Sequence, residues 1–230
     1  MKKGKLYGIG VGPGDPELMT LKAVRLIQEC AVIAVPKGGA GEQTALNIAS
    51  QWIKHQTLLH CDMPMTRDQA ILNACHEKAA DDICAQLDTG KDVAFLTLGD
   101  PSIYSTYWYV HQRVQTRGYE VEMVPGIPSF CAAAARIGQA LCEGKQMLHI
   151  IPASHESTKE GLELSGNKVL MKAGRSILEV RDYLEQKNQL NRATLIECCG
   201  MKDERIIQNV SQLNKPTKYF STIIIREDTK

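Results

Sequence analysis

Three short loops rich in glycine and proline carry the residue types that point most clearly to a ligand. They cover residues 8–14, 98–104 and 124–129, and each follows a short apolar run of the kind that forms a buried strand. Glycine lets a backbone approach another backbone or a ligand closely. A tight turn without a ligand would explain any single loop. Three such loops predict a shared ligand site, because ligands of open α/β sheets bind outside the carboxyl ends of the strands.

The first loop does not match the known phosphate-binding motifs. In Gly8-Ile-Gly-Val-Gly-Pro-Gly14, the dinucleotide pattern GxGxxG would need a glycine where Pro13 or Asp15 stands. The next predicted strand also ends in Pro36-Lys37, without the acidic residue that contacts a ribose. The P-loop pattern GxxxxGK[ST] does not occur in the chain. The sequence therefore predicts a ligand site that is not built around a phosphate motif.

The loops are positioned by strands and helices that alternate through the first half of the chain. Predicted strands cover residues 6–11, 31–35, 57–60, 93–98 and 120–124, and predicted helices cover 20–29, 42–54, 67–88 and 105–117. Such alternation is typical of a mainly parallel sheet covered by helices. We predict a first α/β domain, residues 1–125, around a mainly parallel five-stranded sheet.

The second half of the chain has a different pattern. An Ala-rich helix at 129–137 is followed by predicted strands near 146–151, 168–171, 193–197, 205–209 and 219–225, with one long helix at 176–187. The short segment 211–216 between the last two strands favours an antiparallel step. We therefore predict a second small α/β domain, residues 126–230, with a mixed five-stranded sheet.

Composition narrows the class of protein. The 230 residues are 43% hydrophobic and 23% charged, as in an ordinary globular chain. The net charge of +1 argues against a protein that coats nucleic acid. The longest stretch without Asp, Glu, Lys or Arg, residues 123–135, is too short to span a bilayer, and no signal-peptide pattern follows the basic first residues. We expect a cytoplasmic protein without a membrane or nucleic-acid partner.

The eight cysteines show no CxxC pair and no Cys/His cluster at zinc spacing, so no metal site is predicted. Several stand in or beside apolar runs, where reduced cysteine behaves as a small hydrophobe. The adjacent Cys198 and Cys199 stay open between a redox or metal role and ordinary reduced cysteines.

Four segments resemble the motifs of one family. Gly10-Val-Gly-Pro-Gly-Asp-Pro-Glu-Leu-Met-Thr-Leu-Lys-Ala23 resembles the opening motif of the tetrapyrrole methylases, the class III S-adenosylmethionine-dependent methyltransferases. Residues 98–106 resemble their second motif, usually Gly-Gly-Asp-Pro, residues 124–130 the third, and residues 197–207 a late Glu…Arg segment. The resemblance covers the whole chain in order. It implies two α/β domains with the active site in the trough between them, normally in a homodimer.

Within the family, residues 99–106, 125–130 and 219–221 are most similar to the C20 branch. This implies transfer of the methyl group of S-adenosylmethionine to C20 of precorrin-2 or cobalt-factor II, on the way to the corrin ring of cobalamin, with S-adenosylhomocysteine as product. The eight free cysteines suit an anaerobic, reducing environment and therefore favour cobalt-factor II. The alternatives are methylation at another ring carbon or of a diphthamide precursor or ribosomal RNA, a non-catalytic nucleotide-sensing domain, and a dimerisation module.

Matched position by position, the resemblance implies a set of cofactor contacts. Tyr104 and Thr222 are added because they adjoin matched positions or lie on the last strand. Leu98 replaces the usual first glycine of its motif, and Pro128 lacks the backbone donor and hydroxyl of the threonine that relatives often have. Without the motifs, Asp100 would be a turn residue and Met171 a core residue. The cofactor residues are Pro13, Leu98, Gly99, Asp100, Ile103, Tyr104, Pro128, Ser129, Met171, Gly200 and Thr222.

The implied substrate is a large flat macrocycle with eight carboxylate arms, which would fit an apolar trough rimmed by cations. A solvated surface charge is the alternative for each candidate cation. The candidates are Lys37, Arg67, Arg136, His155, Lys172 and Arg175. The sequence has no Ser/His/Asp or paired-carboxylate constellation, so no catalytic base is assigned to the loss of a proton after methyl transfer.

Overall fold

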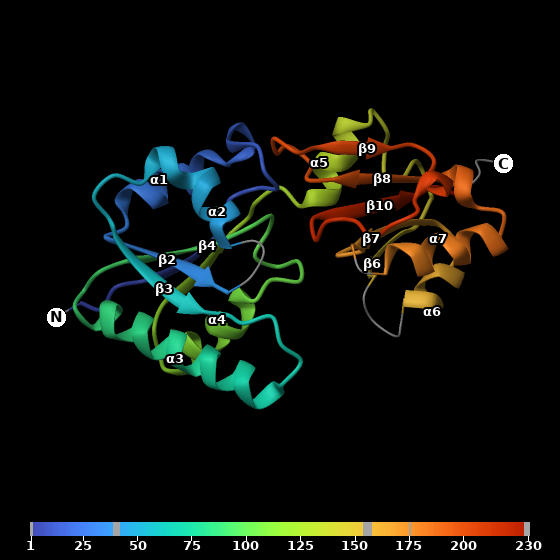
Figure 1. Cartoon of the computed structure of the whole chain (residues 1–230). Helices are drawn as coiled ribbons and strands as arrows, with labels where there is room; N and C mark the ends of the chain where they lie inside the picture. The colour runs from blue at the N-terminus through green and yellow to red at the C-terminus, as the bar shows by residue number, and fades with distance from the viewer. Residues whose placement is uncertain (1, 39–41, 154–157, 175, 228–230) are drawn as a thin grey trace. The chain divides into compact units, whose positions relative to one another are not determined.

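The computed structural model divides into two compact units, Met1–Pro128 and Ser129–Lys230 (Figure 1). It describes residues 2–38, 42–153, 158–174 and 176–227. The division falls three residues after the boundary predicted at 125/126. Gly126 belongs to the first unit because its backbone N–H donates a hydrogen bond to Asp100.

The first unit is built on a five-stranded sheet whose strands are all parallel. The strand order is β3-β2-β4-β1-β5. The central strand β4 is buried at every residue, as its unbroken apolar sequence predicts. Each strand ends within two residues of its predicted limits, so the predicted sheet is confirmed. The strands are β1 (Leu6–Gly10), β2 (Val32–Lys37), β3 (Thr57–Asp62), β4 (Val93–Thr97) and β5 (Val121–Val124).

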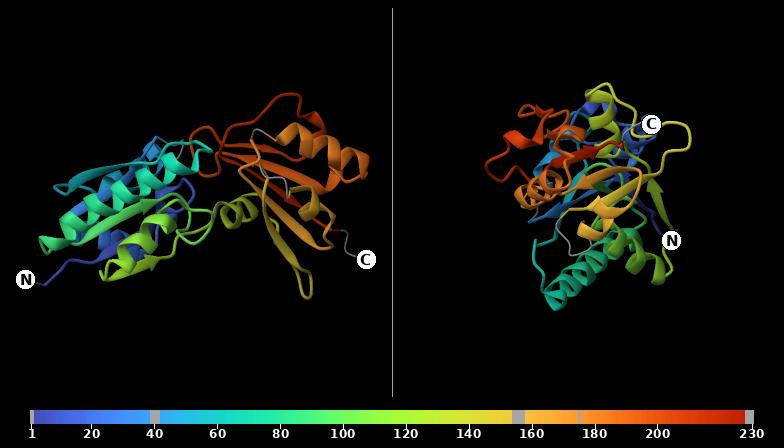
Figure 2. Two further views of the ribbon diagram at one scale, coloured as in Figure 1. Left: turned by 90° about the horizontal axis from the view of Figure 1, so that it is seen from below. Right: turned by 90° about the vertical axis from the view of Figure 1, so that its right-hand side faces the viewer.

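Four helices cover the two faces of this sheet. Helices α1 (Leu21–Glu29) and α2 (Glu42–Ala49) pack on one face, where Ile27 meets Ile33 and Leu96 in one apolar cluster. Helices α3 (Gln69–Asp88) and α4 (Tyr107–Thr116) pack on the other face with Phe95 (Figures 1 and 2). The predicted helix 42–54 is shorter than expected, because residues 50–52 form a 3₁₀ turn. A second 3₁₀ turn, Pro16–Leu18, follows the first glycine-rich loop.

The second unit contains a mixed sheet with strand order β6-β7-β10-β8-β9. Strands β6 and β7 are parallel, and the other neighbouring pairs are antiparallel. The predicted mixed sheet is confirmed, but the direct antiparallel step between the last two strands is wrong. Strands β9 and β10 both pair with β8, because fully buried β10 takes the central position. The strands are β6 (Leu148–Pro152), β7 (Asn167–Met171), β8 (Ala193–Glu197), β9 (Arg205–Ile207) and β10 (Ser221–Ile225).

The helices of the second unit are α5 (Ser129–Arg136), α6 (Thr158–Glu163) and α7 (Ile177–Gln186), with 3₁₀ turns at Leu190–Arg192 and Val210–Gln212. One apolar cluster joins α6 and α7 to the sheet, and α5 packs against β10. Helix α6 was not predicted, because Leu162 is the one large apolar residue in its six-residue sequence and gives no periodicity.

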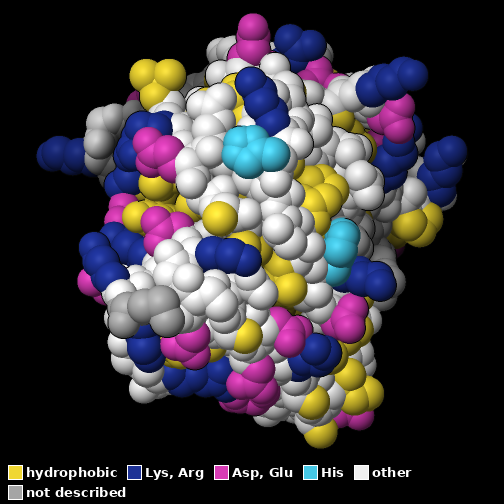
Figure 3. Space-filling model, turned by 90° about the vertical axis from the view of Figure 1, so that its left-hand side faces the viewer, with side chains coloured by type: hydrophobic (Ala, Val, Ile, Leu, Met, Phe, Trp, Pro, Cys, Tyr) yellow, Lys and Arg dark blue, Asp and Glu magenta, His cyan; other side chains and the backbone are white. Residues whose placement is uncertain are grey.

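On the face seen in Figure 3, positive and negative side chains are interspersed, in keeping with a net charge of +1. No helix in the described part of the chain is both long enough and apolar enough to cross a bilayer.

Candidate functional site

The three glycine-rich loops meet at the carboxyl ends of β4, β1 and β5. Strand β1 lies between the other two, and Gly12 and Gly99 exchange backbone hydrogen bonds of 3.3 and 2.8 Å. A Cβ atom on Gly126 would lie 2.1 Å from the carbonyl oxygen of Gly99. Only glycine fits at position 126, because the third loop lies directly against the second. The loops converge as the sequence predicts, and the ligand they bind stays a prediction.

Asp100 joins the second loop to the third. Its Oδ2 accepts a hydrogen bond from the backbone N–H of Gly126 at 3.0 Å. Its Oδ1 accepts from the backbone N–H of Ser102 at 2.8 Å and from the Ser102 hydroxyl at 2.5 Å. Hydrogen bonds to a carboxylate are stronger than those between neutral groups. Asp100 therefore anchors two loops, a role that its position before Pro101 did not reveal.

Gly99 leaves open space beside these contacts. Its φ of +73° is in the left-handed region, and an added Cβ atom would meet no heavy atom within 4 Å. A ligand can therefore approach the backbone at this point without displacing a side chain. Near it along the second loop, Tyr104 is exposed and has a φ of +48°, a conformation that costs a residue other than glycine about 1–2 kcal/mol. Strained backbone of this kind is concentrated at functional sites.

The remaining predicted cofactor residues of the first unit flank the loops. Pro13 is buried in the first loop, Leu98 is half-buried against the core at the end of β4, and Ile103 is half-buried before Tyr104. Pro128 is the half-buried last residue of this unit.

In the second unit, the predicted cofactor residues gather at one edge of the mixed sheet. Met171 ends β7 and pairs directly with Thr222 near the start of β10. The hydroxyl of Ser129, the first residue of α5, lies 3.4 Å from the hydroxyl of Thr222. Gly200 lies in the turn that follows β8 at the same edge. The fold thus brings together residues that are up to 93 positions apart in the chain.

The turn after β8 is held by two carboxylates. Glu204 accepts a hydrogen bond from the backbone N–H of Gly200 at 2.8 Å and from Nε of Arg136 at 2.5 Å. Burial alone would raise the pKa of Glu204, but the Gly200 N–H and Arg136 outweigh it, and the net pKa is lowered. Arg136, a predicted substrate contact, therefore has a structural partner in this unit.

Glu197 is the second carboxylate, and the sequence assigned it no role. It is 4% exposed and accepts hydrogen bonds from Nε of Arg205 and the backbone N–H of Lys218, each at 2.7 Å. Glu197 and Arg205 face each other across β8 and β9. The Glu…Arg spacing in residues 197–207 is the sequence signal for this pair, because Glu197 and Arg205 lie opposite each other on the antiparallel strands β8 and β9.

The candidate substrate cations lie in several places. Lys37 and Arg67 are exposed near the carboxyl ends of β2 and β3, on the same edge of the first sheet as the glycine-rich loops. Lys172 is half-buried directly after Met171, with a φ of +58°, and burial lowers the pKa of its ammonium group. His155 and Arg175 lie outside the described residues.

The adjacent thiols of Cys198 and Cys199 are not activated. Burial raises the pKa of both, to about 11 for Cys199, so they stay protonated at neutral pH. In the part of the chain that the structure describes, no group of three or more His, Cys, Asp or Glu side chains could hold a metal ion.

A family model described as tetrapyrrole (corrin/porphyrin) methylases matches residues 5–214. The chain belongs to this family. The family predicted from the motifs is confirmed, and with it the predicted enzyme class, a methyltransferase. The glycine-rich loops, the Gly200 turn and the Glu197–Arg205 pair all lie within the part of the chain that the family model matches.

Two relatives within the tetrapyrrole methylases match almost the whole chain. The cobalt-precorrin-2 C(20)-methyltransferase of Salmonella typhimurium is 31% identical over 230 residues, which cover 97% of each chain. A precorrin-2 C(20)-methyltransferase from a Sinorhizobium species is 27% identical and covers 96% of this chain and 95% of its own. Uroporphyrin-III C-methyltransferase from Thermus thermophilus, solved with S-adenosylhomocysteine, has the same fold with a TM-score of 0.71, 19% identity and coverage of 97% and 98%.

The residues present fit the cofactor implied by this tetrapyrrole methylase family. S-adenosylmethionine has no phosphate groups, in agreement with loops that lack a phosphate motif. The open space beside Gly99 leaves room for a ligand against the loop backbone, and half-buried Leu98 and Ile103 offer apolar surface beside it.

Proposed function

We propose that this chain is an S-adenosylmethionine-dependent C-methyltransferase that acts at C20 of cobalt-factor II or precorrin-2 in cobalamin biosynthesis. One observation carries the proposal: the chain aligns end to end with an enzyme named for this reaction, at 31% identity. The convergence of three loops on Gly99 supports a cofactor site at these loops.

The predicted cofactor residues divide into two groups with different tasks. Gly99, Leu98 and Ile103 would contact the cofactor directly, while Asp100 fixes the loops that present them. Ser129, Met171, Gly200 and Thr222 form the second group, and Glu204 holds the backbone of Gly200 in place.

When bound, S-adenosylmethionine supplies an electrophilic methyl group that already carries its own sulfonium leaving group. The side chains of this protein therefore need not form a covalent intermediate. Their task is to hold and orient the reactants, and orientation alone can lower a barrier by about 7–11 kcal/mol. We assign no residue to the removal of the proton from C20. Asp100 is poorly suited to it, because both of its oxygens accept hydrogen bonds from the loops.

For the substrate, we propose that the carboxylate arms of the tetrapyrrole are bound by Lys172 and by the exposed Lys37 and Arg67. The half-buried Lys172 adjoins Met171, which supports its place next to the reaction. Arg136 is a weaker candidate because it already pairs with Glu204. Any cobalt ion would enter as part of the substrate. We further propose that the enzyme works in the cytoplasm as a homodimer, without a nucleic-acid or membrane partner.

Methylation at a different ring carbon is the main alternative within the family. It has less support, since the relatives from Salmonella typhimurium and the Sinorhizobium species, which match this chain along nearly their whole length, are named for C20. A nucleotide-sensing domain would need a phosphate-binding loop, and the sequence has no such motif. A dimerisation module would leave the convergence of the three loops unexplained.

The experiment is to incubate the protein anaerobically with S-adenosylmethionine and either precorrin-2 or cobalt-factor II, and to follow the product by mass spectrometry. A gain of one methyl group on either substrate supports the proposal, and the faster substrate decides the cobalt question. Tight binding of S-adenosylhomocysteine without turnover of either substrate would refute the C20 assignment while sparing the cofactor.

A further inference from the structure

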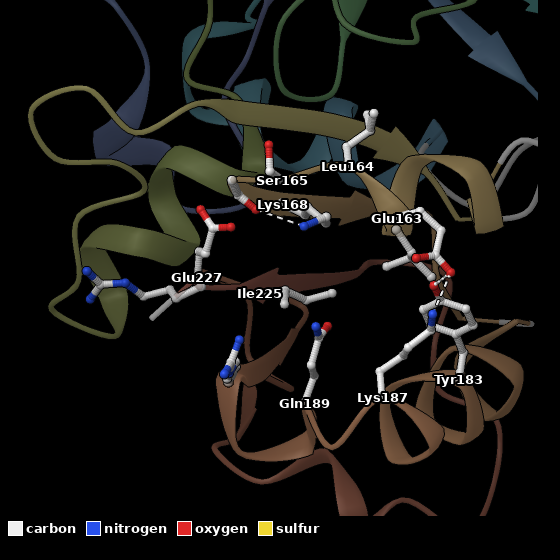
Figure 4. A pocket seen from close by; sticks show the side chains of 13 residues that line it. Glu163, Leu164, Ser165, Lys168, Tyr183, Lys187, Gln189, Ile225 and Glu227 are labelled. Atoms are coloured by element: carbon white, nitrogen blue, oxygen red, sulfur yellow. Dashed lines mark hydrogen bonds and ion pairs between the residues drawn. The ribbon is translucent and has the colours of Figure 1, made fainter. Parts of the chain in front are cut away.

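The second unit contains a cavity at the edge of its sheet opposite to Met171 and Thr222. Ile225 pairs with Lys168 at this edge, three residues along each strand from the Thr222–Met171 pair, or about 10 Å. The cavity has a volume of about 260 Å³, room for about nine water molecules or a small organic ion. Its wall includes Lys168, Gln189 and Ile225 (Figure 4).

Lys168 is the unusual residue of this cavity. The residue is only 7% exposed, and its ammonium group, drawn between Ser165 and Ile225 in Figure 4, donates a hydrogen bond to the carbonyl oxygen of Gly166 at 2.8 Å. Among the described residues, no carboxylate lies within ion-pair distance of this ammonium group. A buried charge that has a single neutral partner is costly, because neither water nor an opposite charge stabilises it fully.

The carboxylates that line the cavity leave Lys168 without a close partner. Glu163 is bound at one end by Lys187, at 2.8 Å, and by the hydroxyl of Tyr183. Glu227 lies at the other end of the cavity in Figure 4. Burial lowers the pKa of Lys168, although Glu227 and Glu163 act in the opposite direction. The distant carboxylates therefore do not make up for the water that the ammonium group has lost.

Most of the charged side chains that line the cavity are cationic. Four cationic side chains line the cavity against two carboxylates, and one of the four, Arg226, pairs at 2.7 Å with Glu143, which is not part of the lining. Since Lys187 pairs with Glu163 and Arg226 with Glu143, it is the buried ammonium group of Lys168 that suits an anion. The four cationic residues are Lys168, Lys187, Arg192 and Arg226.

We propose that this cavity binds a small anion whose carboxylate or phosphate group accepts a hydrogen bond from the ammonium group of Lys168. The ligand is smaller than a tetrapyrrole or S-adenosylmethionine, and the site lies across the sheet from the residues assigned to them. The side-chain amide of Gln189 lines the same space and offers a further donor.

The test is titration calorimetry of the full chain with inorganic phosphate and, separately, with succinate, at an ionic strength held constant with chloride. Lys168→Met keeps the buried stem and removes the charge, and we expect it to weaken binding at least about tenfold. Gln189→Glu places a negative charge in the lining and should also weaken binding. Lys145→Met, at an exposed position outside the lining, is the matched control and should leave binding unchanged.

The comparison of the two probes identifies the anionic group that the site prefers. Binding of neither probe, or equal binding by the unmodified chain and Lys168→Met, would overturn the proposal. If Lys168→Met does not fold, Gln189→Glu decides, and unchanged affinity in that variant would overturn it equally. Methyl transfer is not the readout, so the result is independent of the function proposed above.

Discussion

The carboxylate of Asp100 accepts a hydrogen bond from the backbone N–H of Gly126 at 3.0 Å, across 26 positions of the chain. This bond connects the loop after β4 with the loop after β5, while Gly12 and Gly99 connect the loops after β1 and β4. The surface proposed for the cofactor thus consists of loop backbone, and the side chain of Asp100 holds two of these loops together. The expected effects of substitution follow from that arrangement.

Asp100→Ala removes the oxygen that accepts from Gly126 and the oxygen that accepts both hydrogen bonds from Ser102. Loss of hydrogen bonds to a charged group costs about 1.5–3 kcal/mol, so we expect affinity for S-adenosylhomocysteine to fall about 10- to 100-fold in titration calorimetry. Asp62→Ala, at an exposed carboxylate at the end of β3, should keep full affinity. Equal affinity of Asp100→Ala and the unmodified chain would show that the anchor does not matter for the cofactor.

Gly126→Ala tests the close approach of the loops. Its Cβ atom would lie 2.1 Å from the Gly99 carbonyl oxygen, so the loops must separate, at a cost of about 1–3 kcal/mol. We expect affinity for S-adenosylhomocysteine to drop at least about tenfold. Gly118→Ala is the control: Gly118 has a φ of +81° and an added Cβ atom would meet no heavy atom within 4 Å, so the substitution should cost about 1–2 kcal/mol in stability and no affinity. Retained affinity in Gly126→Ala would contradict the arrangement of the loops.

Glu197→Ala tests the turn between β8 and β9. It leaves the partly buried backbone N–H of Lys218 without an acceptor and Arg205 without its partner, and we expect a loss of about 1–3 kcal/mol in the free energy of unfolding. Glu197→Gln keeps an acceptor oxygen and should lose less. Urea denaturation measures both against Glu185→Ala, an exposed position on α7. A loss no larger than that of Glu185→Ala would argue against a structural role for Glu197.

Because two histidines are buried, we predict that the folded protein is less stable in acid. Burial lowers the pKa of His76 and His111 below the ordinary value of 6.5, and Arg113 adds to the effect on His76. The unfolded chain therefore takes up protons at a higher pH than the folded chain. This contribution to stability is complete above pH 6.5 and is lost as the pH falls through the lowered pKa values.

His76→Phe separates this effect from other acid effects. The Nδ1 atom of His76 is buried without a hydrogen-bond partner in the described structure, and the ring stacks on Tyr109 at 4.9 Å, a contact that phenylalanine preserves. We expect His76→Phe to lose less stability than the unmodified chain between pH 7.5 and 5.5 in urea denaturation. His55→Phe, at an exposed position, should behave as the unmodified chain. An unchanged acid dependence in His76→Phe would refute the assignment.

Local patterns in the sequence were sufficient for most strands and helices. The unbroken apolar run Val93–Thr97 predicts a central strand of a parallel sheet, and it is β4. The helices predicted from residues 20 and 67 begin one and two residues later, because Thr20 and Asp68 are caps whose side chains accept hydrogen bonds from the first turn. Each cap stands directly before the first helical residue, so the helical pattern of the sequence included it.

Pairings between distant residues could not be predicted in the same way. The sequence shows a short segment before β10, but not that β10 lies between β7 and β8, because the order of strands depends on burial in the whole sheet. The motif around Asp100 marked a site but not its bond to Gly126. Cavity-lining Lys168 belongs to no motif, and its burial follows from the register of β7 and β10.

The position of the transferred methyl group tests the central claim most directly. The protein is supplied with S-adenosylmethionine labelled with ¹³C in its methyl group, together with precorrin-2 or cobalt-factor II, and the product is examined by NMR. We expect one labelled methyl group, bonded to the meso carbon C20. A label at any other ring carbon, or a product without label while S-adenosylhomocysteine binds tightly, would contradict the proposed function.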